Sequence, residues 1–171
     1  MLQLSNMLMN QPILSLRTGT EVATLIKPII NPHNLKIEGF YCQDNVDRRE
    51  LILLPQDIRD ALPQGLVIND HDALTEAKDL VRLQSVLALN FELVGKNVRT
   101  TSKTKLGKVE DYATDIPSMF IQKIYVSQSI LKSFSGGNLG VDRTQIVEIN
   151  DKEIVINDLE AKVPANARAM A

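Results

Sequence analysis

Cysteine, tryptophan and histidine are scarce in this chain, and their scarcity excludes several kinds of site. The only cysteine is Cys42, so the chain can form neither an intramolecular disulfide nor a cysteine-rich zinc site. Tryptophan is absent, and aromatic residues make up 4% of the sequence. The formal net charge of −2 argues against a general attraction to nucleic acid or to anionic membranes, although it permits a local basic patch.

Long apolar runs are also missing. The first residues contain no Lys or Arg before Arg17, and Asn6, Asn10 and Pro12 interrupt their apolar character, so they lack both parts of a signal peptide. No run approaches the roughly 20 apolar residues that a membrane helix needs. We therefore expect a cytoplasmic protein without direct membrane insertion.

An internal repeat is the strongest pattern that the sequence does contain. The segment Val67-Ile68-Asn69-Asp70 recurs as Val155-Ile156-Asn157-Asp158, at a shift of 88 residues. Earlier in each half the shift is 84, which places Ile37 on Ile121 and Tyr41 on Tyr125. An ordered series of matches in register indicates two copies of one fold. The predicted organisation is a first repeat at 1–75, a linker helix at 76–90, a second repeat at 91–162 and a disordered tail at 163–171.

Strands dominate the prediction in both halves, and they are separated by turn residues. The expected fold is mainly β, with two tandem small antiparallel β-barrels joined by a short helix. Pro28 and Pro32 are expected to bracket a connection, because proline donates no ladder hydrogen bond. Leu80, Leu83, Val86 and Leu87 recur at helical spacing, so a helix is expected near 79–89, packed between the two lobes. The expected strands are 12–16, 21–26, 35–43, 50–54, 66–69, 97–102, 106–113, 120–127, 145–149 and 153–157, with a helical turn at 55–58.

The second half contains two glycine-bearing segments, Gly95-Lys96-Asn97-Val98 and Leu106-Gly107-Lys108-Val109-Glu110-Asp111, followed by an alternating strand at 120–126. In these residues it resembles the PRC-barrel family. The first half carries a decayed version at 10–13 and 21–25, without either glycine. The family includes the cytoplasmic domain of the photosynthetic reaction-centre H subunit and the C-terminal domain of a bacterial ribosome maturation factor. The resemblance implies a strongly bent antiparallel β-barrel used in adaptor or assembly roles, although a fold alone does not define a function.

The densest positive charge lies in the predicted hairpin at 96–108, which contains five basic residues and no acidic one. On one face of a hairpin, these residues would attract RNA phosphate or an acidic protein surface. Alternatively, they are a solvated edge, where lysines discourage sheet-to-sheet aggregation. Aromatic residues that would stack on bases are absent from the hairpin. The five residues are Lys96, Arg99, Lys103, Lys105 and Lys108.

The remaining candidates for chemistry are weak. His71 lies between Asp70 and Asp72, but successive residues of an extended segment point in different directions, so an exposed turn is expected there and at His33. Cys42 is expected to be a buried, inert thiol. The flexible loop expected at 133–138 has glycines but lacks the Lys-Ser/Thr of a phosphate loop. Charged residues at 57–60 and 142–143 are expected to pair locally and to serve the structure.

These observations favour a non-enzymatic protein that acts through a protein partner, without catalytic residues, cofactor or metal. The alternative is binding of RNA or a ribonucleoprotein through the basic hairpin. A third possibility is membrane association through a partner, because the reaction-centre relative is anchored to a membrane by a helix that has no counterpart here. The sequence leaves the partner's identity and the oligomeric state open.

Overall fold

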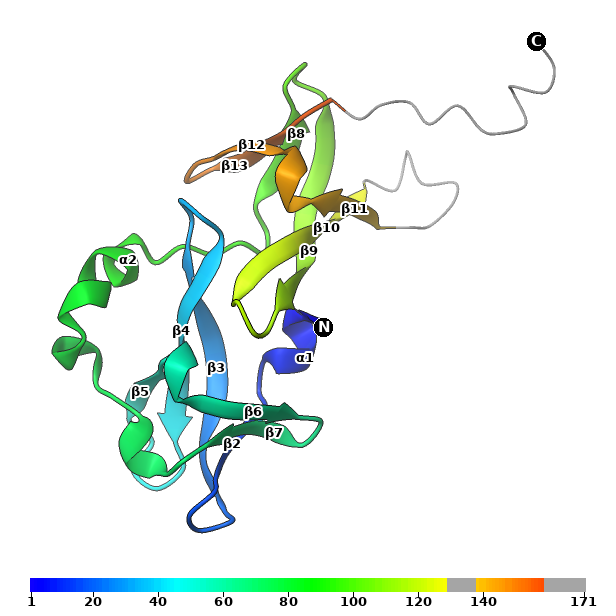
Figure 1. Ribbon diagram of the computed structural model, residues 1–171. Coiled ribbons are helices and arrows are strands. Elements are labelled where there is room, and N and C mark those ends of the chain that lie inside the picture. Colours follow the sequence, from blue (N-terminus) through cyan, green and yellow to red (C-terminus); the bar gives the residue numbers. More distant parts are fainter. Residues whose placement is uncertain (129–137, 159–171) are drawn as a thin grey trace.

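The computed structural model describes residues 1–128 and 138–158, and these residues are mainly β-strand (Figure 1). The expectations of a flexible loop at 133–138 and a disordered tail at 163–171 fall outside the described residues, apart from Asn138. The strands are β1 (Leu2–Leu4), β2 (Pro12–Ser15), β3 (Glu21–Asn31), β4 (Lys36–Asp44), β5 (Glu50–Leu53), β6 (Ile58–Leu62), β7 (Gly65–Ile68), β8 (Asn97–Thr100), β9 (Lys105–Asp115), β10 (Phe120–Gln128), β11 (Leu139–Asp142), β12 (Ile146–Ile149) and β13 (Glu153–Ile156). The helices are α1 (Ser5–Leu8) and α2 (Gln84–Leu89), with 3₁₀ turns η1 (Pro55–Asp57), η2 (His71–Ala73), η3 (Ala77–Asp79), η4 (Val81–Leu83) and η5 (Arg143–Gln145).

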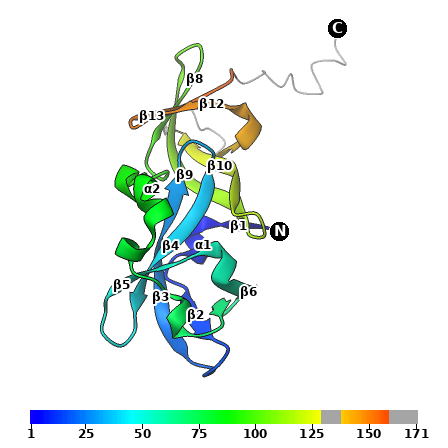
Figure 2. The same cartoon turned by 60° about the vertical axis from the view of Figure 1, so that its left-hand side comes forward.

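All thirteen strands belong to one mixed sheet, whose main path runs β12-β13-β8-β9-β10-β4-β3-β2-β7-β6. Off this path, β1 pairs with β9, β11 with β10, and β5 with β4. The expectation of a mainly β chain is confirmed. The sheet is open, however, and its pairings do not close it into a barrel. Figures 1 and 2 show β8, β12 and β13 at one end of the molecule and β2, β6 and β7 at the other.

The order of strand pairing at 12–68 recurs at 97–156. In each half the first strand pairs antiparallel with a long second strand and parallel with the last one, as β2 does with β3 and β7, and β8 with β9 and β13. Strands β3 and β9 each have eleven residues, and β4 and β10 each have nine. A 3₁₀ turn precedes the closing antiparallel pair in both halves.

Irregularities of the ladder recur as well. A β-bulge places one unpaired extra residue in a strand, which bends the strand and shifts its side chains between faces. In β4 the extra residue is Glu38, and its effect is that Ile37 and Phe40 are both fully buried. Simple alternation along the strand would place Ile37 on the face opposite Phe40, and the bulge prevents this. The extra residues are Val22, Ile26, Glu38 and Arg59 in the first half, and Leu106, Glu110, Gln122 and Val147 at the matching places of the second.

The two halves meet at the tips of their central hairpins, where Lys36 pairs with Phe120. The residues before these, Leu35 and Met119, are both buried and have positive φ angles of 55° and 59°. The amide of Ile37 donates to the carbonyl of Met119 at 2.8 Å, and the amide of Ile121 donates to the carbonyl of Leu35 at 2.9 Å. This reciprocal pair of bonds extends the sheet from one half into the other.

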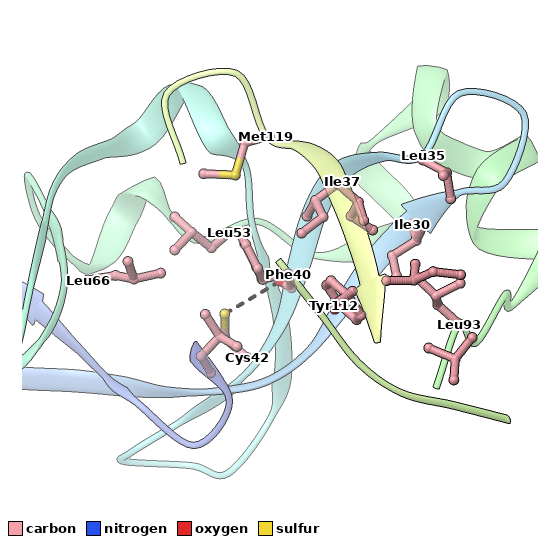
Figure 3. Packing of buried hydrophobic residues seen from close by; sticks show 14 of the residues in the cluster. Ile30, Leu35, Ile37, Phe40, Cys42, Leu53, Leu66, Leu93, Tyr112 and Met119 are labelled. Atoms are coloured by element: carbon pink, nitrogen blue, oxygen red, sulfur yellow. Dashed lines mark hydrogen bonds between the residues drawn. The ribbon is translucent and has the colours of Figure 1, made fainter. Parts of the chain in front are cut away.

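Buried side chains from both halves form one continuous hydrophobic core. Figure 3 shows Met119 and Tyr112 of the second half among buried residues of the first, including Phe40. Apolar burial stabilises by roughly 25 cal/mol per Å², so sharing one core ties the stability of the halves together. The predicted boundaries of the two repeats, at residues 75 and 91, stay a prediction.

The linker differs from its prediction. Only residues 84–89 are α-helical, after the two 3₁₀ turns η3 and η4, and no residue of 77–90 is buried. Val81 is 79% exposed, and α2 lies against β3. The helix therefore packs on β3 without burying an apolar stripe between the lobes.

Short strands and one proline position were also mispredicted. Pro28 lies inside β3, opposite Phe40, and not in a connection. The strands β1, β6 and β11 were not expected, and β1 with α1 packs on β9 of the second half. Within the described residues, no helix is long and apolar enough to cross a membrane.

Candidate functional site

Four of the five basic residues expected in a hairpin line one open groove with a volume of about 1260 Å³. The groove lies over β8, the start of β9 and the β12–β13 turn, and Lys152 adds a further cation. Its acidic residues are Asp151 and Glu153. Four of the five predicted cations therefore line one groove, with carboxylates beside them. The four residues are Arg99, Lys103, Lys105 and Lys108.

Two of the five predicted cations are held by other groups. The Arg99 Nε donates to Glu153 Oε1 at 2.8 Å, and both side chains are about 30% exposed. The Lys96 Nζ donates to the carbonyl of Asp151 at 2.5 Å and lies 4.9 Å from the ring centre of Phe91, outside the groove. These two residues link the hairpin to neighbouring segments.

The other three, Lys103, Lys105 and Lys108, are exposed, and no carboxylate of the described residues forms an ion pair with them. Lys103 sits at the hairpin turn with a φ of 68°. The carboxylate of Asp158 fixes this turn, because it accepts hydrogen bonds from the amide and hydroxyl of Ser102 at 3.1 and 2.8 Å. The same bonds hold the pKa of Asp158 below its usual range. Together with Lys152, which lines the same groove, these three lysines are the cations of the groove that no ion pair engages among the described residues.

The two family-type glycines have different roles. At Gly107, with φ of 144°, an added Cβ would collide with the backbone carbonyl of Ser127 on β10. At Gly95, with φ of 91°, nothing lies within 4 Å of an added Cβ, so the need for glycine is conformational.

His71 is more than an exposed turn, contrary to the prediction. Its Nε2 contacts Oδ2 of Asp44, whose side chain is only 1% exposed. Asp44 also accepts from the amide of Val46 at 2.7 Å. These hydrogen bonds, chiefly that from His71, lower the pKa of Asp44. The pair ties the β4–β5 turn to the segment after β7. Sequence gave no signal for it, because the two residues are 27 positions apart.

The remaining small candidates are structural. Cys42 is fully buried, and burial raises the pKa of its thiol to about 12, so it is an inert thiol as expected. His33 is exposed in the turn between β3 and β4, and its amide donates to Asn31 Oδ1 at 3.0 Å. The charged residues at 57–60 and 142–143 do not pair with one another: Arg59 donates to Asn69 at 3.0 Å, and Asp142 caps η5. In the described ranges, no three His, Cys, Asp or Glu side chains converge as metal ligands.

A second cavity, of about 310 Å³, lies between β3, α2 and the segment 90–94, and the sequence analysis missed it. Its walls are mostly apolar, with Lys27 and Glu92 at its charged positions. Lys27 Nζ lies 5.2 Å from the ring centre of Tyr41 and donates to Asn90 Oδ1 at 3.4 Å. Several exposed apolar residues surround or adjoin it, which is the type of feature that marks interaction sites. They are Ile26 at 42%, Leu89 at 48% and Val94 at 48% exposure.

The cavity walls are anchored in the other half. Ser5 on α1 donates its amide to Asp111 Oδ1 at 3.1 Å, and its hydroxyl contacts the same oxygen. The adjacent Tyr112 is buried, which raises the pKa of its hydroxyl. The bulge at Ile26, which lines the cavity, is not revealed by any periodicity of the sequence.

No protein-family model matches the chain, and no curated protein matches it.

Proposed function

We propose that this protein is a non-enzymatic adaptor or assembly protein of the PRC-barrel type, built from two repeats and acting through a protein partner. The resemblance at 95–111 and the recurrence of all four bulges at matching places support the two repeats. The candidates for chemistry are separate from one another: Cys42 is buried, and His71 is engaged by Asp44. A reacting centre needs an acid, a base or a nucleophile that converge on one point.

The observation that carries the proposal is the apolar surface around the 310 Å³ cavity. Ile26 and Val94 line the concave apolar wall and are 42% and 48% exposed, and Leu89, 48% exposed, directly precedes Asn90 of the same lining. Interfaces place apolar anchors in such pockets and surround them with polar groups. Lys27, Asn90 and Glu92 supply polar groups there.

The test is reciprocal co-purification of the full chain from its native cells. We expect a specific partner to copurify with the wild type, and the pair Ile26→Glu with Val94→Glu to abolish its recovery. Val46→Glu is the matched control, because Val46 is 90% exposed and lies outside the cavity lining. Recovery that is unaffected by the charged pair, or turnover in a screen of enzyme assays, would contradict the proposal.

A second candidate function is binding of RNA or a ribonucleoprotein through the groove of Arg99, Lys103, Lys105 and Lys108. The observation that favours it is that these cations share one open groove with Lys152. Phosphate contacts release counterions, so affinity falls linearly with salt on logarithmic axes, with a slope of roughly −0.7 per phosphate for a single strand.

The test is a salt titration of binding to a single-stranded oligonucleotide. Lys103→Glu with Lys105→Glu should weaken binding and reduce the magnitude of the slope of log K against log salt concentration by about 1.4, which corresponds to the loss of two phosphate contacts. The control Lys78→Glu with Arg82→Glu changes net charge equally on the linker and should leave binding unchanged. Equal effects of both pairs would show that only total charge matters, and the groove would be ruled out.

A further inference from the structure

The first half lacks a strand that the second half has. In the second half, β1 adds to the outer edge of β9, with Leu2 opposite Asp115, Gln3 opposite Thr114 and Leu4 opposite Ala113. Strand β8 pairs with the same edge of β9 nearer its start, at residues 105–108. Beyond β8, the ladder continues through Val109, whose amide donates to the Lys96 carbonyl at 2.9 Å. The outer edge of β9 is thus paired near both of its ends.

The equivalent edge of β3 is paired only at its beginning. The counterpart of Val109 is Leu25, and its amide likewise donates to the Gln11 carbonyl at 2.9 Å. Among the described residues, no strand pairs with β3 on this side after Leu25. By the 84-residue shift, the places where β1 pairs with β9 correspond to Ile29, Ile30 and Asn31. A strand edge with free backbone groups is a template for another strand.

The reason for this difference lies in the segment that precedes each half. Strands β2 and β8 pair with equivalent residues of β3 and β9, so Pro12 of β2 corresponds to Asn97 of β8, 85 residues later. The same shift of 85 makes residues 87–89 the counterpart of β1. These residues form the end of α2, a helix, and they cannot add to a sheet edge in that conformation. The 310 Å³ cavity lies between α2 and residues 26–30 of β3. It is the space left where a strand in one half is replaced by a helix in the other.

We propose that the outer edge of β3 at 29–31, together with the adjoining cavity, binds an extended apolar peptide of a partner protein as an added antiparallel strand. This inference rests on the adaptor function proposed above and names the form of its partner. Strand addition obtains affinity from main-chain hydrogen bonds and specificity from pockets for alternate side chains. The volume of about 310 Å³ is at the lower end of ligand pockets, roughly 300–1,000 Å³, and suits one or two aliphatic side chains.

The chain itself shows which peptide chemistry fits such an edge. In β1, Leu2 and Leu4 alternate with Gln3, so the two leucines share one face of the strand. The walls of the cavity are apolar at Ile26, Pro28, Val86, Leu87 and Val94. One lysine and one glutamate line it, so no strong charge is demanded of the ligand. The expected ligand has apolar residues at alternate positions and no net charge over that stretch.

The experiment is a titration of the full-length ¹⁵N-labelled protein with an acetylated, amidated peptide that copies residues 1–6. We expect saturable amide shifts at 26–31 and 90–94. A scrambled peptide is the control. Saturable shifts confined to 113–115 would report exchange with β1 at its own site and would overturn the proposal, as would the absence of shifts at 26–31 up to millimolar peptide.

Backbone methylation tests the strand itself. In an antiparallel pair, alternate residues point their N–H groups at the partner strand. N-methylation at one alternate set of peptide amides should weaken binding at least tenfold, and methylation at the other set should leave it unchanged. Equal affinity for both methylated peptides would overturn strand addition.

Two variants locate the site. Leu87→Trp and Val94→Trp fill the cavity and should each weaken binding at least tenfold, whereas Val46→Trp should not. The fold of each variant is checked by its amide spectrum. Sedimentation of the free protein tests whether a second copy of this chain occupies the edge instead. A dimer that Leu87→Trp dissociates would assign the edge to a second copy and overturn the proposal of a partner peptide. If co-purification depends on Ile26 and Val94 while peptide binding fails, the adaptor function stands and strand addition does not.

Discussion

Truncation of one buried side chain in each half tests whether the halves are energetically one unit. Ile37 and Ile121 correspond in the two halves, both are fully buried, and both donate backbone hydrogen bonds across the junction of the hairpins. Replacing a buried isoleucine with alanine costs about 2–5 kcal/mol through lost transfer energy and the cavity left behind. For a chain of this size each kcal/mol shifts the melting temperature by about 2–4 °C, so a loss of about 3 kcal/mol lowers it by roughly 6–12 °C.

The assay is urea and thermal unfolding followed by far-ultraviolet circular dichroism. Ile37→Ala and Ile121→Ala should each move one single transition, because the core and the sheet are continuous through the junction. Val46→Ala, at a 90% exposed position, should change the free energy of unfolding by less than about 0.5 kcal/mol. Two separate transitions, each shifted by only one of the variants, would refute the shared core and support independent lobes.

Three further outcomes follow from local geometry. Gly107→Ala should lower the free energy of unfolding in urea by more than about 2 kcal/mol, because the added Cβ collides with the backbone of β10. Gly19→Ala is the control: Gly19 has a φ of 67° and open space around it, so the substitution should cost about 1 kcal/mol. Equal costs of the two substitutions would contradict the collision. The pKa of Asp44 is lowered in the folded protein, so its contribution to stability is complete above the unfolded pKa of about 3.9 and disappears as pH falls through the lower folded value. His71→Gln should reduce this loss of stability in acid unfolding curves. An acid unfolding curve that the substitution leaves unchanged would contradict the pairing of His71 with Asp44. The thiol of Cys42, buried and with a pKa of about 12, should resist iodoacetamide at pH 8 until urea unfolds the protein, and rapid native labelling would refute its burial.

The sequence predicted the β content well, because short apolar runs bounded by turn residues mark most of the strands. The verbatim match of 67–70 with 155–158 falls on β7 and β13, which occupy the same position in their halves. The bulges escaped prediction because they depend on the partner strand. Alternation alone placed Ile37 opposite Phe40, and only the extra residue Glu38 brings both into the core.

The predictions of the linker helix and of the short strands were wrong for a different reason. The leucine spacing at 80–87 is typical of an amphipathic helix, yet short helices gain most of their stability from packing. No residue of 77–90 is buried, so packing stabilises only the short helix 84–89. Strand β1 has three residues and no turn signal, and it exists because β9 offers it an edge. Tertiary partners decide such elements, and a local pattern does not contain them.

The candidate site divided in the same way. The charge cluster at 96–108 could be found from the sequence, because its residues are neighbours on one hairpin. Its partial neutralisation by Asp151 and Glu153 could not, since these residues come from the β12–β13 turn, more than 40 residues away. The cavity beside β3 joins segments near residues 5, 28, 87 and 92, and no sequence pattern links them.

The added strand can be tested most directly by measuring contacts between the peptide and the edge of β3. With the peptide of residues 1–6 bound to the full-length protein, we predict interstrand nuclear Overhauser effects between peptide α-protons and residues Ile29 and Asn31, in an antiparallel register. Slowed hydrogen exchange of the outward-facing amides at 29–31 should accompany them. Bound peptide that contacts only side chains of Val86, Leu87 and Val94, with no cross-strand effects and unchanged exchange along β3, would contradict strand addition.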